Sequence, residues 1–329
     1  MAKFIAKRLG LSVIIFFFVT FIIYILEYSL PTSYVEKTAR ELATRPGNTK
    51  SAEQWIDELN AQYGMDQGVV KGYGIWLSNT VRGNFGDSWS QTMPVTDLFN
   101  SCIWYSFVMG LISFVLEIFI AIPLGVVAVR KQYSITDYSV TVVSMVAISM
   151  PTFFVATVLK LIFSVKLGWF ELVGMQGRYY ATLDAVGKFW DLANHLVLPI
   201  LTLTIVGIGG LMRYTRTNML EVLNADYVRT ARAKGLPESK VISHHAFRNT
   251  LIPLVTILGG SLPGLFSGAL ITETLFGIRG IGYYAYNAMV AGDIPFTMFY
   301  LAFISILTLL GNLISDILYA VVDPRVRVN

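Results

Sequence analysis

The sequence predicts an all-α protein that crosses a membrane six times. Hydrophobic residues make up 54% of the 329 residues and charged residues only 14%, and the mean hydropathy is +0.60. A soluble domain of this length does not have such a composition. A hydrocarbon core of about 30 Å needs roughly 20 apolar residues per helix. Six segments meet that requirement: 9–30, 104–129, 138–165, 196–213, 250–276 and 296–322.

The orientation of these six helices follows from the distribution of Lys and Arg. Both ends of the chain and the connections after the second and fourth helices are short and basic, which is typical of cytoplasmic segments. The other three connections mix their bases with comparable numbers of acids, so we expect them outside. The net charge of +4 is therefore a topology signal, and it gives no support to nucleic-acid binding.

The first element is a membrane helix over residues 1–30, followed by an outward insertion over 31–103. Ser51 and Gln54 have the spacing of a capping box, which predicts that a helix begins between them. A second amphipathic pattern runs from Val69 to Val81. The insertion is therefore expected to be a small helical unit rather than a simple connector.

The second and third membrane helices carry the first residues of functional interest. Glu117 lies near the middle of the second helix, where an ionisable group is costly; it either lines a pathway or pairs with a neighbouring helix. Glu27 and Lys160 lie near outer ends and are expected to extend to the interface. Met150 and Pro151 predict a break in the third helix.

A basic hairpin follows the fourth helix, within a loop over 214–249 of the core formed by 104–329. Leu220, Leu223, Tyr227 and Ala231 recur at helical steps. Gly235 is expected to end that helix in the left-handed region. Pro237 then favours the start of a second short helix, at about 238–249. A solvated, amphipathic connection is the simplest interpretation of this loop, and a docking element is the alternative.

The fifth helix contains Gly260, Gly264 and Gly268 at four-residue steps, interrupted by Pro253 and Pro263. Small residues at this spacing let helices approach closely, and prolines free carbonyl groups that need a partner or a cavity. Tight packing within one subunit and a pathway helix at a subunit interface both fit the pattern.

These elements together resemble the permease subunits of ABC importers for dipeptides, oligopeptides and nickel. The hairpin resembles the cytoplasmic EAA loop of that family, with Arg229, Thr230 and Ala231 in place of its Glu-Ala-Ala and Gly235 four residues later. The outward segment 59–99, the segment 273–296 and the last helix also match the family's patterns. The resemblance covers nearly the whole chain and implies a MetI-like permease fold.

The resemblance also implies roles for particular residues. Those expected to couple to the ATPase through the 226–253 loop are Tyr227, Arg229, Thr230, Ala231, Arg232, Ala233, Gly235 and Leu236. Candidates for the translocation pathway are Glu117, Met150, Pro151, Gly260, Pro263 and Gly264. A structural role at the end of the chain is expected for Asn312, Asp316, Asp323, Pro324 and Arg325.

The implied protein is a multi-pass subunit of a bacterial or archaeal cytoplasmic membrane, with both termini inside. Its implied partners are a second, similar permease, two cytoplasmic ABC ATPases and an external substrate-binding protein, with the lipid bilayer around them. The chain itself is expected to bind no cofactor, because ATP and Mg²⁺ would be held by the ATPases. Di- or oligopeptides fit the family best as substrates, while glutathione, nickel complexes and oligosaccharides remain alternatives.

An enzyme and a self-sufficient secondary transporter are the rival classes. The Gly187–Lys188 pair is followed by Phe189 and does not form a phosphate-binding loop. Glu117 and Asp316 lie at different membrane depths without a histidine partner, and the three histidines lack metal-ligand spacing. We therefore expect neither a catalytic nor a metal site. A secondary transporter would usually contain an inverted repeat, which we do not find in this sequence.

Overall fold

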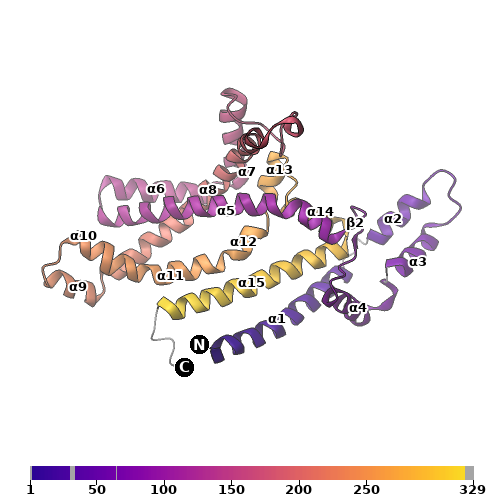
Figure 1. Cartoon of the computed structure of the whole chain (residues 1–329), viewed down its shortest axis with the longest axis horizontal. Coiled ribbons are helices and arrows are strands. Elements are labelled where there is room, and N and C mark those ends of the chain that lie inside the picture. The colour runs from indigo at the N-terminus through magenta and orange to yellow at the C-terminus, as the bar shows by residue number, and fades with distance from the viewer. Residues whose placement is uncertain (1, 30–33, 64, 323–329) are drawn as a thin grey trace. The chain divides into compact units, whose positions relative to one another are not determined.

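The computed structural model describes residues 2–29, 34–63 and 65–322, and most of its elements are helices (Figure 1). In this described part, four helices are long and apolar enough to cross a membrane, and two bent helix pairs raise that number to six. The predicted all-α, multi-span architecture is therefore confirmed. The chain forms two compact units: Met1–Ile103 with Ile281–Leu309, and Trp104–Gly280 with Leu310–Asn329.

The first unit combines the N-terminal helix and the predicted insertion with the later segment Ile281–Leu309. Two long helices, α5 (Val95–Arg130) and α15 (Ile294–Val322), begin in this unit and continue in the second. The other elements are α1 (Ala2–Ser29), α2 (Tyr34–Ala43), α3 (Ala52–Tyr63), the 3₁₀ turn η1 (Met65–Gln67), α4 (Val69–Val81), β1 (Asp87–Ser88), β2 (Met93–Pro94) and α14 (Ile281–Ala291).

The insertion is held together by local capping and by a small apolar core. The backbone N–H of Gln54 donates to Ser51 Oγ at 3.3 Å, and the N–H of Ser51 donates back to Gln54 Oε1 at 3.0 Å. This is the predicted capping box, and α3 begins between the two residues. Val35, Ala39 and Leu59 are buried where α2 packs on α3. The insertion is therefore a folded helical unit, as the sequence predicts.

The second unit holds the bent helices and the basic hairpin (Figure 1). After α5 come α6 (Ile135–Ser149), α7 (Thr152–Leu159), the π-helical η2 (Lys160–Lys166), the 3₁₀ turn η3 (Tyr180–Thr182), α8 (Ala185–Leu223), α9 (Asp226–Ala233), α10 (Glu238–Lys240), the π-helical η4 (Val241–Ala246), α11 (Phe247–Gly260), α12 (Leu262–Phe266) and α13 (Leu270–Phe276). α6 packs along α8, and α13 packs on α7.

A sharp bend separates α6 from α7. The two helices meet at 102°, with Met150 in an extended conformation (ψ 124°) directly before Pro151. Proline excludes the residue before it from the helical region and lacks the N–H that would continue the ladder. The predicted break is therefore present, and it turns the chain rather than merely kinking a straight span.

Two predicted boundaries differ from the structure. The second helix of the hairpin does not end at 249: α10, η4 and α11 follow one another directly, and residues at their junctions have helical dihedral angles. The chain stays helical through Pro253, which lies inside α11, and it bends there by 42° instead of ending the helix. The fifth membrane segment, predicted as a single run over 250–276, consists of α11, α12 and α13. Gly268 (φ +76°) lies in the break between the last two.

Candidate functional site

The basic hairpin is closed by a glycine turn and an ion pair. Lys234 is the C-cap of α9, and Gly235 follows it with φ +76°, the left-handed conformation expected from the sequence. Across the turn, Arg232 donates from Nη2 to Glu238 Oε1 at 2.7 Å and from Nε to Oε2 at 3.1 Å. This two-pronged hydrogen bond raises the pKa of Arg232, so the pair holds α9 against the start of α10.

The two faces of α9 have different surroundings. Val228 and Ala231 are buried against Val241 of η4, whereas Tyr227 is 46% exposed. The predicted apolar stripe that included Tyr227 is therefore wrong, because α8 ends at Leu223 and the helical register does not continue across the break. Of the other predicted coupling residues, Arg229, Thr230, Arg232, Ala233 and Gly235 are exposed and Leu236 is half-buried.

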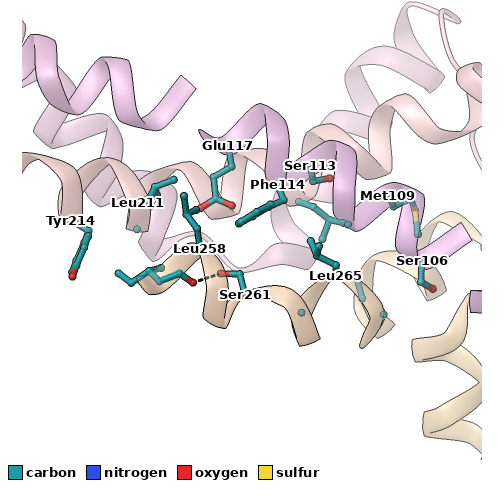
Figure 2. A pocket seen from close by; sticks show the side chains of 17 residues that line it. Ser106, Met109, Ser113, Phe114, Glu117, Leu211, Tyr214, Leu258, Ser261 and Leu265 are labelled. Atoms are coloured by element: carbon teal, nitrogen blue, oxygen red, sulfur yellow. Dashed lines mark hydrogen bonds between the residues drawn. The ribbon is translucent and has the colours of Figure 1, made fainter. Parts of the chain in front are cut away.

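A cavity of about 510 Å³ lies in the second unit, between α5, α8 and the α11–α12 segment (Figure 2). Its wall is mainly apolar, with Phe114, Leu211, Leu258 and Leu265 among the lining residues. The polar side chains in the wall are Ser106, Ser113 and Glu117 from α5, Tyr214 from α8, and Ser261 between α11 and α12. The arrangement suits a solute that is largely apolar and carries a few polar groups.

Among the described residues that line this wall, Glu117 is the one with a formal charge. Its carboxylate lies against Gly207 of α8, where an added Cβ would be 2.5 Å from Oε2. Among the described residues, Glu117 forms neither an ion pair nor a hydrogen bond. Of the two interpretations that the sequence left open, this placement supports lining a cavity over pairing with a neighbouring helix.

The predicted pathway residues do not form one site. Glu117 and Gly264 line the cavity, whereas Met150 and Pro151 line a separate depression at the bend between α6 and α7. Gly260 and Pro263 are not among the cavity-lining residues. The sequence analysis missed Ser106 and Ser113, although a signal was present: Ser106, Gly110, Ser113 and Glu117 follow at steps of four, three and four in an otherwise apolar helix.

Close helix approach occurs at glycines other than the predicted ones. An added Cβ at Gly264 would meet no atom within 4 Å, and at Gly260 it would only touch Ser315 Oγ at 3.9 Å. By contrast, a Cβ at Gly209 would lie 2.7 Å from the carbonyl oxygen of Ser144, and one at Gly259 would lie 2.7 Å from Ser315 Oγ. Tightly packed glycines therefore lie on α8 and at the end of α11, and also on α5, where an added Cβ at Gly110 would lie 2.9 Å from the carbonyl oxygen of Leu265.

Glu273 is fully buried and ties α13 to α5. Ser106 Oγ donates to Glu273 Oε1 at 2.7 Å, and the backbone N–H of Ala269 donates to the same oxygen at 3.0 Å. A Cβ at Gly280 would collide with both Ser106 Oγ and the Glu273 carboxyl. Only glycine therefore lets the chain after α13 pass beside this carboxylate.

Asp293 plays a similar part in the first unit, where it caps α15. Its Oδ1 accepts from the backbone N–H of Phe296 at 3.3 Å. Its Oδ2 accepts from Ser88 Oγ at 2.5 Å, Ser90 Oγ at 2.7 Å and the Ser90 N–H at 2.9 Å. Asp293 is fully buried, so it fastens the turn after β1 to the start of α15.

Lys160, for which the sequence predicted only an extension toward the membrane interface, caps a helix. Its Nζ donates to the carbonyl oxygen of Leu275 at 2.5 Å and lies 5.3 Å from the centre of the Phe276 ring. Both partners belong to the last turn of α13, whose carbonyl groups lack helical partners and favour a cation. No local pattern predicts this contact, because Lys160 and Leu275 are 115 residues apart.

The last helix contacts α11 through residues next to the predicted ones. Ser315 Oγ donates to the Thr256 carbonyl oxygen at 2.6 Å, and Gly311 lies against the carbonyl oxygen of Gly259. Asn312 is exposed and Asp316 half-buried. Asp323, Pro324 and Arg325 lie outside the described residues. Within the described residues, no group of three His, Cys, Asp or Glu side chains is placed to hold a metal ion.

The long apolar helices, the intramembrane cavity and the hairpin define a membrane transport component. Residues 121–328 match the family model described as the binding-protein-dependent transport system inner membrane component, and the chain belongs to this family. Such a permease works with ATPase and substrate-binding partners.

Three relatives have printed names that specify their transport systems. The chain is 37% identical to the oligopeptide transport system permease protein AppB of Bacillus subtilis, over 84% of each chain. It is 34% identical to the di/tripeptide transport system permease protein DppB of Pseudomonas aeruginosa, over 99% of each. With the oligopeptide transport system permease protein OppB of Haemophilus influenzae it shares 32% identity, over 91% of this chain and 96% of the relative.

Proposed function

We propose that this chain is one permease subunit of an ATP-driven importer of di- or oligopeptides. In the proposed assembly, a second, similar permease completes the pathway, two cytoplasmic ATPases supply the energy, and an external binding protein delivers the peptide. Both termini are cytoplasmic. ATP and Mg²⁺ are held by the ATPases, and this chain neither binds them nor hydrolyses ATP. The names of the relatives support peptides over glutathione, nickel complexes and oligosaccharides.

This proposal rests on the different surroundings of the two faces of α9 in the hairpin. One face of α9 is buried against its own chain through Val228 and Ala231, which fixes the position of the helix. On the other face, Tyr227 and Arg229 are exposed to solvent. Tyr and Arg are enriched where proteins dock, because they combine a large contact area with directed hydrogen bonds. A rigid helix with such a face can transmit movement of an ATPase into α8 and α11.

The coupling role is tested by Gly235→Val. At φ +76° a β-branched residue costs about 1 kcal/mol or more, so the turn between α9 and α10 should distort while the membrane helices still pack. We expect normal insertion but reduced co-purification of the ATPases and reduced peptide-stimulated ATP hydrolysis. The matched control is Lys234→Val, which places the same side chain at φ −78°. Equal ATPase association and stimulation in both variants and the wild type would refute the coupling role.

The proposed orientation is tested by cysteine labelling in intact spheroplasts with a membrane-impermeant maleimide. A cysteine at Trp76 of α4 should react from outside, because the basic connections place α4 opposite the hairpin. A cysteine at Lys234 should react only after lysis. The single native cysteine, Cys102, is buried and should give little background. Labelling in the reverse order would refute the six-span topology.

A further inference from the structure

One charged side chain, Glu117, is among the described residues that line the cavity in the second unit, and it faces the open space. Glu117 comes from the same face of α5 as Ser113, one turn away, and Figure 2 shows both beside Phe114 and opposite Leu258 and Ser261. An ionisable side chain within a membrane helix is costly unless it has a partner. Glu117 has no partner among the described residues. Its partner is therefore expected to be a ligand that binds transiently in the cavity.

The fold makes room for the carboxylate. Gly207 on α8 faces it, and any side chain there would meet both carboxyl oxygens, at 2.5 and 3.3 Å from the added Cβ. The carboxylate of Glu273, by contrast, accepts hydrogen bonds from Ser106 and from the backbone. A carboxylate with a structural role in this chain is thus hydrogen-bonded. Glu117 is placed beside a glycine and left open toward the cavity.

The serine hydroxyl groups in the wall add acceptors rather than donors. Ser113 Oγ donates its proton to the carbonyl oxygen of Ile200 at 3.2 Å, and Ser261 Oγ donates to the carbonyl oxygen of Ile257 at 2.9 Å. A hydroxyl that has given its one proton can only accept further hydrogen bonds. A ligand that fits both Glu117 and these oxygens is a cation with several N–H donors.

We propose that this cavity binds an ammonium group through Glu117, and that it thereby favours cationic over anionic cargo in the pathway. The ammonium is the α-amino group or a lysine side chain of the transported peptide, so the inference rests on the proposed function. The apolar wall around Phe114 and Leu265 accommodates the uncharged remainder. Selection by charge would then occur in the membrane as well as at the external binding protein.

The test measures the electrostatic potential in the cavity directly. Ser261→Cys places a thiol in the wall of the assembled transporter, and its modification rates are compared for a trimethylammonium-ethyl and a sulfonato-ethyl methanethiosulfonate. One unit charge at roughly 5 Å attracts the first reagent and repels the second, so Glu117→Gln should lower the ratio of the two rates about tenfold. The matched control is Glu221→Gln, which removes a carboxylate from the exposed cytoplasmic end of α8 and should leave the ratio unchanged.

The outcomes distinguish this inference from the proposed function. An unchanged ratio in Glu117→Gln, or equal changes in both variants, would overturn the ammonium site. Failure of both reagents to modify Ser261→Cys, with and without ATP, would also overturn it, because the cavity would then be closed to solutes. ATPase co-purification and peptide uptake are measured on the same preparations, so an importer that works without a charge-selective cavity would be recognised as such.

Discussion

The cap of α15 in the first unit and the cavity of the second unit use carboxylates in opposite ways. Asp293 is fully buried and accepts hydrogen bonds from two serine hydroxyls and from the backbone. Glu117 borders a cavity of about 510 Å³ and has no such bond with the described residues. A buried carboxylate that is fully hydrogen-bonded supports the fold, whereas one that borders a cavity without partners is available to a ligand.

Glycine residues make the same distinction. Gly209 lies within contact distance of the backbone of α6, and Gly259 lies against Ser315 of α15. Gly264 borders the cavity, and an added Cβ there would meet no atom within 4 Å. Closely packed glycines therefore bring helices together, while the glycine on α12 keeps space open.

The largest expected effect comes from removing the cap of α15. Asp293→Ala leaves the hydroxyls of Ser88 and Ser90 and two backbone N–H groups without their acceptor in a buried site. The free energy of unfolding should therefore fall by about 3 kcal/mol. Thermal unfolding of the purified transporter in detergent measures this loss. Glu117→Gln is the matched control and should unfold within about 0.5 kcal/mol of the wild type. Equal stability of Asp293→Ala and the wild type would contradict the contrast drawn between the two carboxylates.

A smaller effect is expected where α6 and α8 meet. Gly209→Ala introduces a Cβ that would lie 2.7 Å from the carbonyl oxygen of Ser144, and forcing the two helices apart should cost about 1–3 kcal/mol. Gly264→Ala adds the same methyl group where there is room and should leave the unfolding temperature unchanged or slightly raised. If both variants lost the same stability, the distinction between packed and open glycines would be wrong.

The smallest effect is expected at the exposed pair that closes the hairpin. The Arg232 and Glu238 side chains are 42% and 56% exposed, and such pairs contribute only about 0.2–1 kcal/mol. Glu238→Gln should therefore speed hydrogen exchange of the hairpin amides modestly in low salt, and the difference should shrink in 1 M salt because the attraction is screened. Glu221→Gln, which removes an exposed carboxylate without an ion-pair partner among the described residues, is the control. A large effect that persists in high salt would contradict this prediction and would mean that Glu238, like Asp293, stabilises the fold strongly.

The sequence by itself determined the features that depend on neighbouring residues. Ser51 and Gln54 form the predicted capping box, Pro151 follows the predicted break, and Gly235 has the predicted positive φ. Each is set by steric or hydrogen-bonding limits within a few residues. The number of apolar segments likewise follows from local composition, since the thickness of the bilayer sets the length of each helix.

Only the tertiary structure decided which groups meet across the chain. Lys160 caps α13 at Leu275, 115 residues away, a contact that its sequence neighbourhood did not predict. Asp293 bonds to Ser88, 205 residues away, and the glycines at 260 and 264 do not make the close approach that their spacing suggested. Periodicity specifies which face of a helix a residue occupies, but not which helix lies opposite. Which helices face each other depends on how the bent segments pack. For this reason, only the tertiary structure could distinguish Glu117, which borders a cavity, from the hydrogen-bonded carboxylates of Glu273 and Asp293.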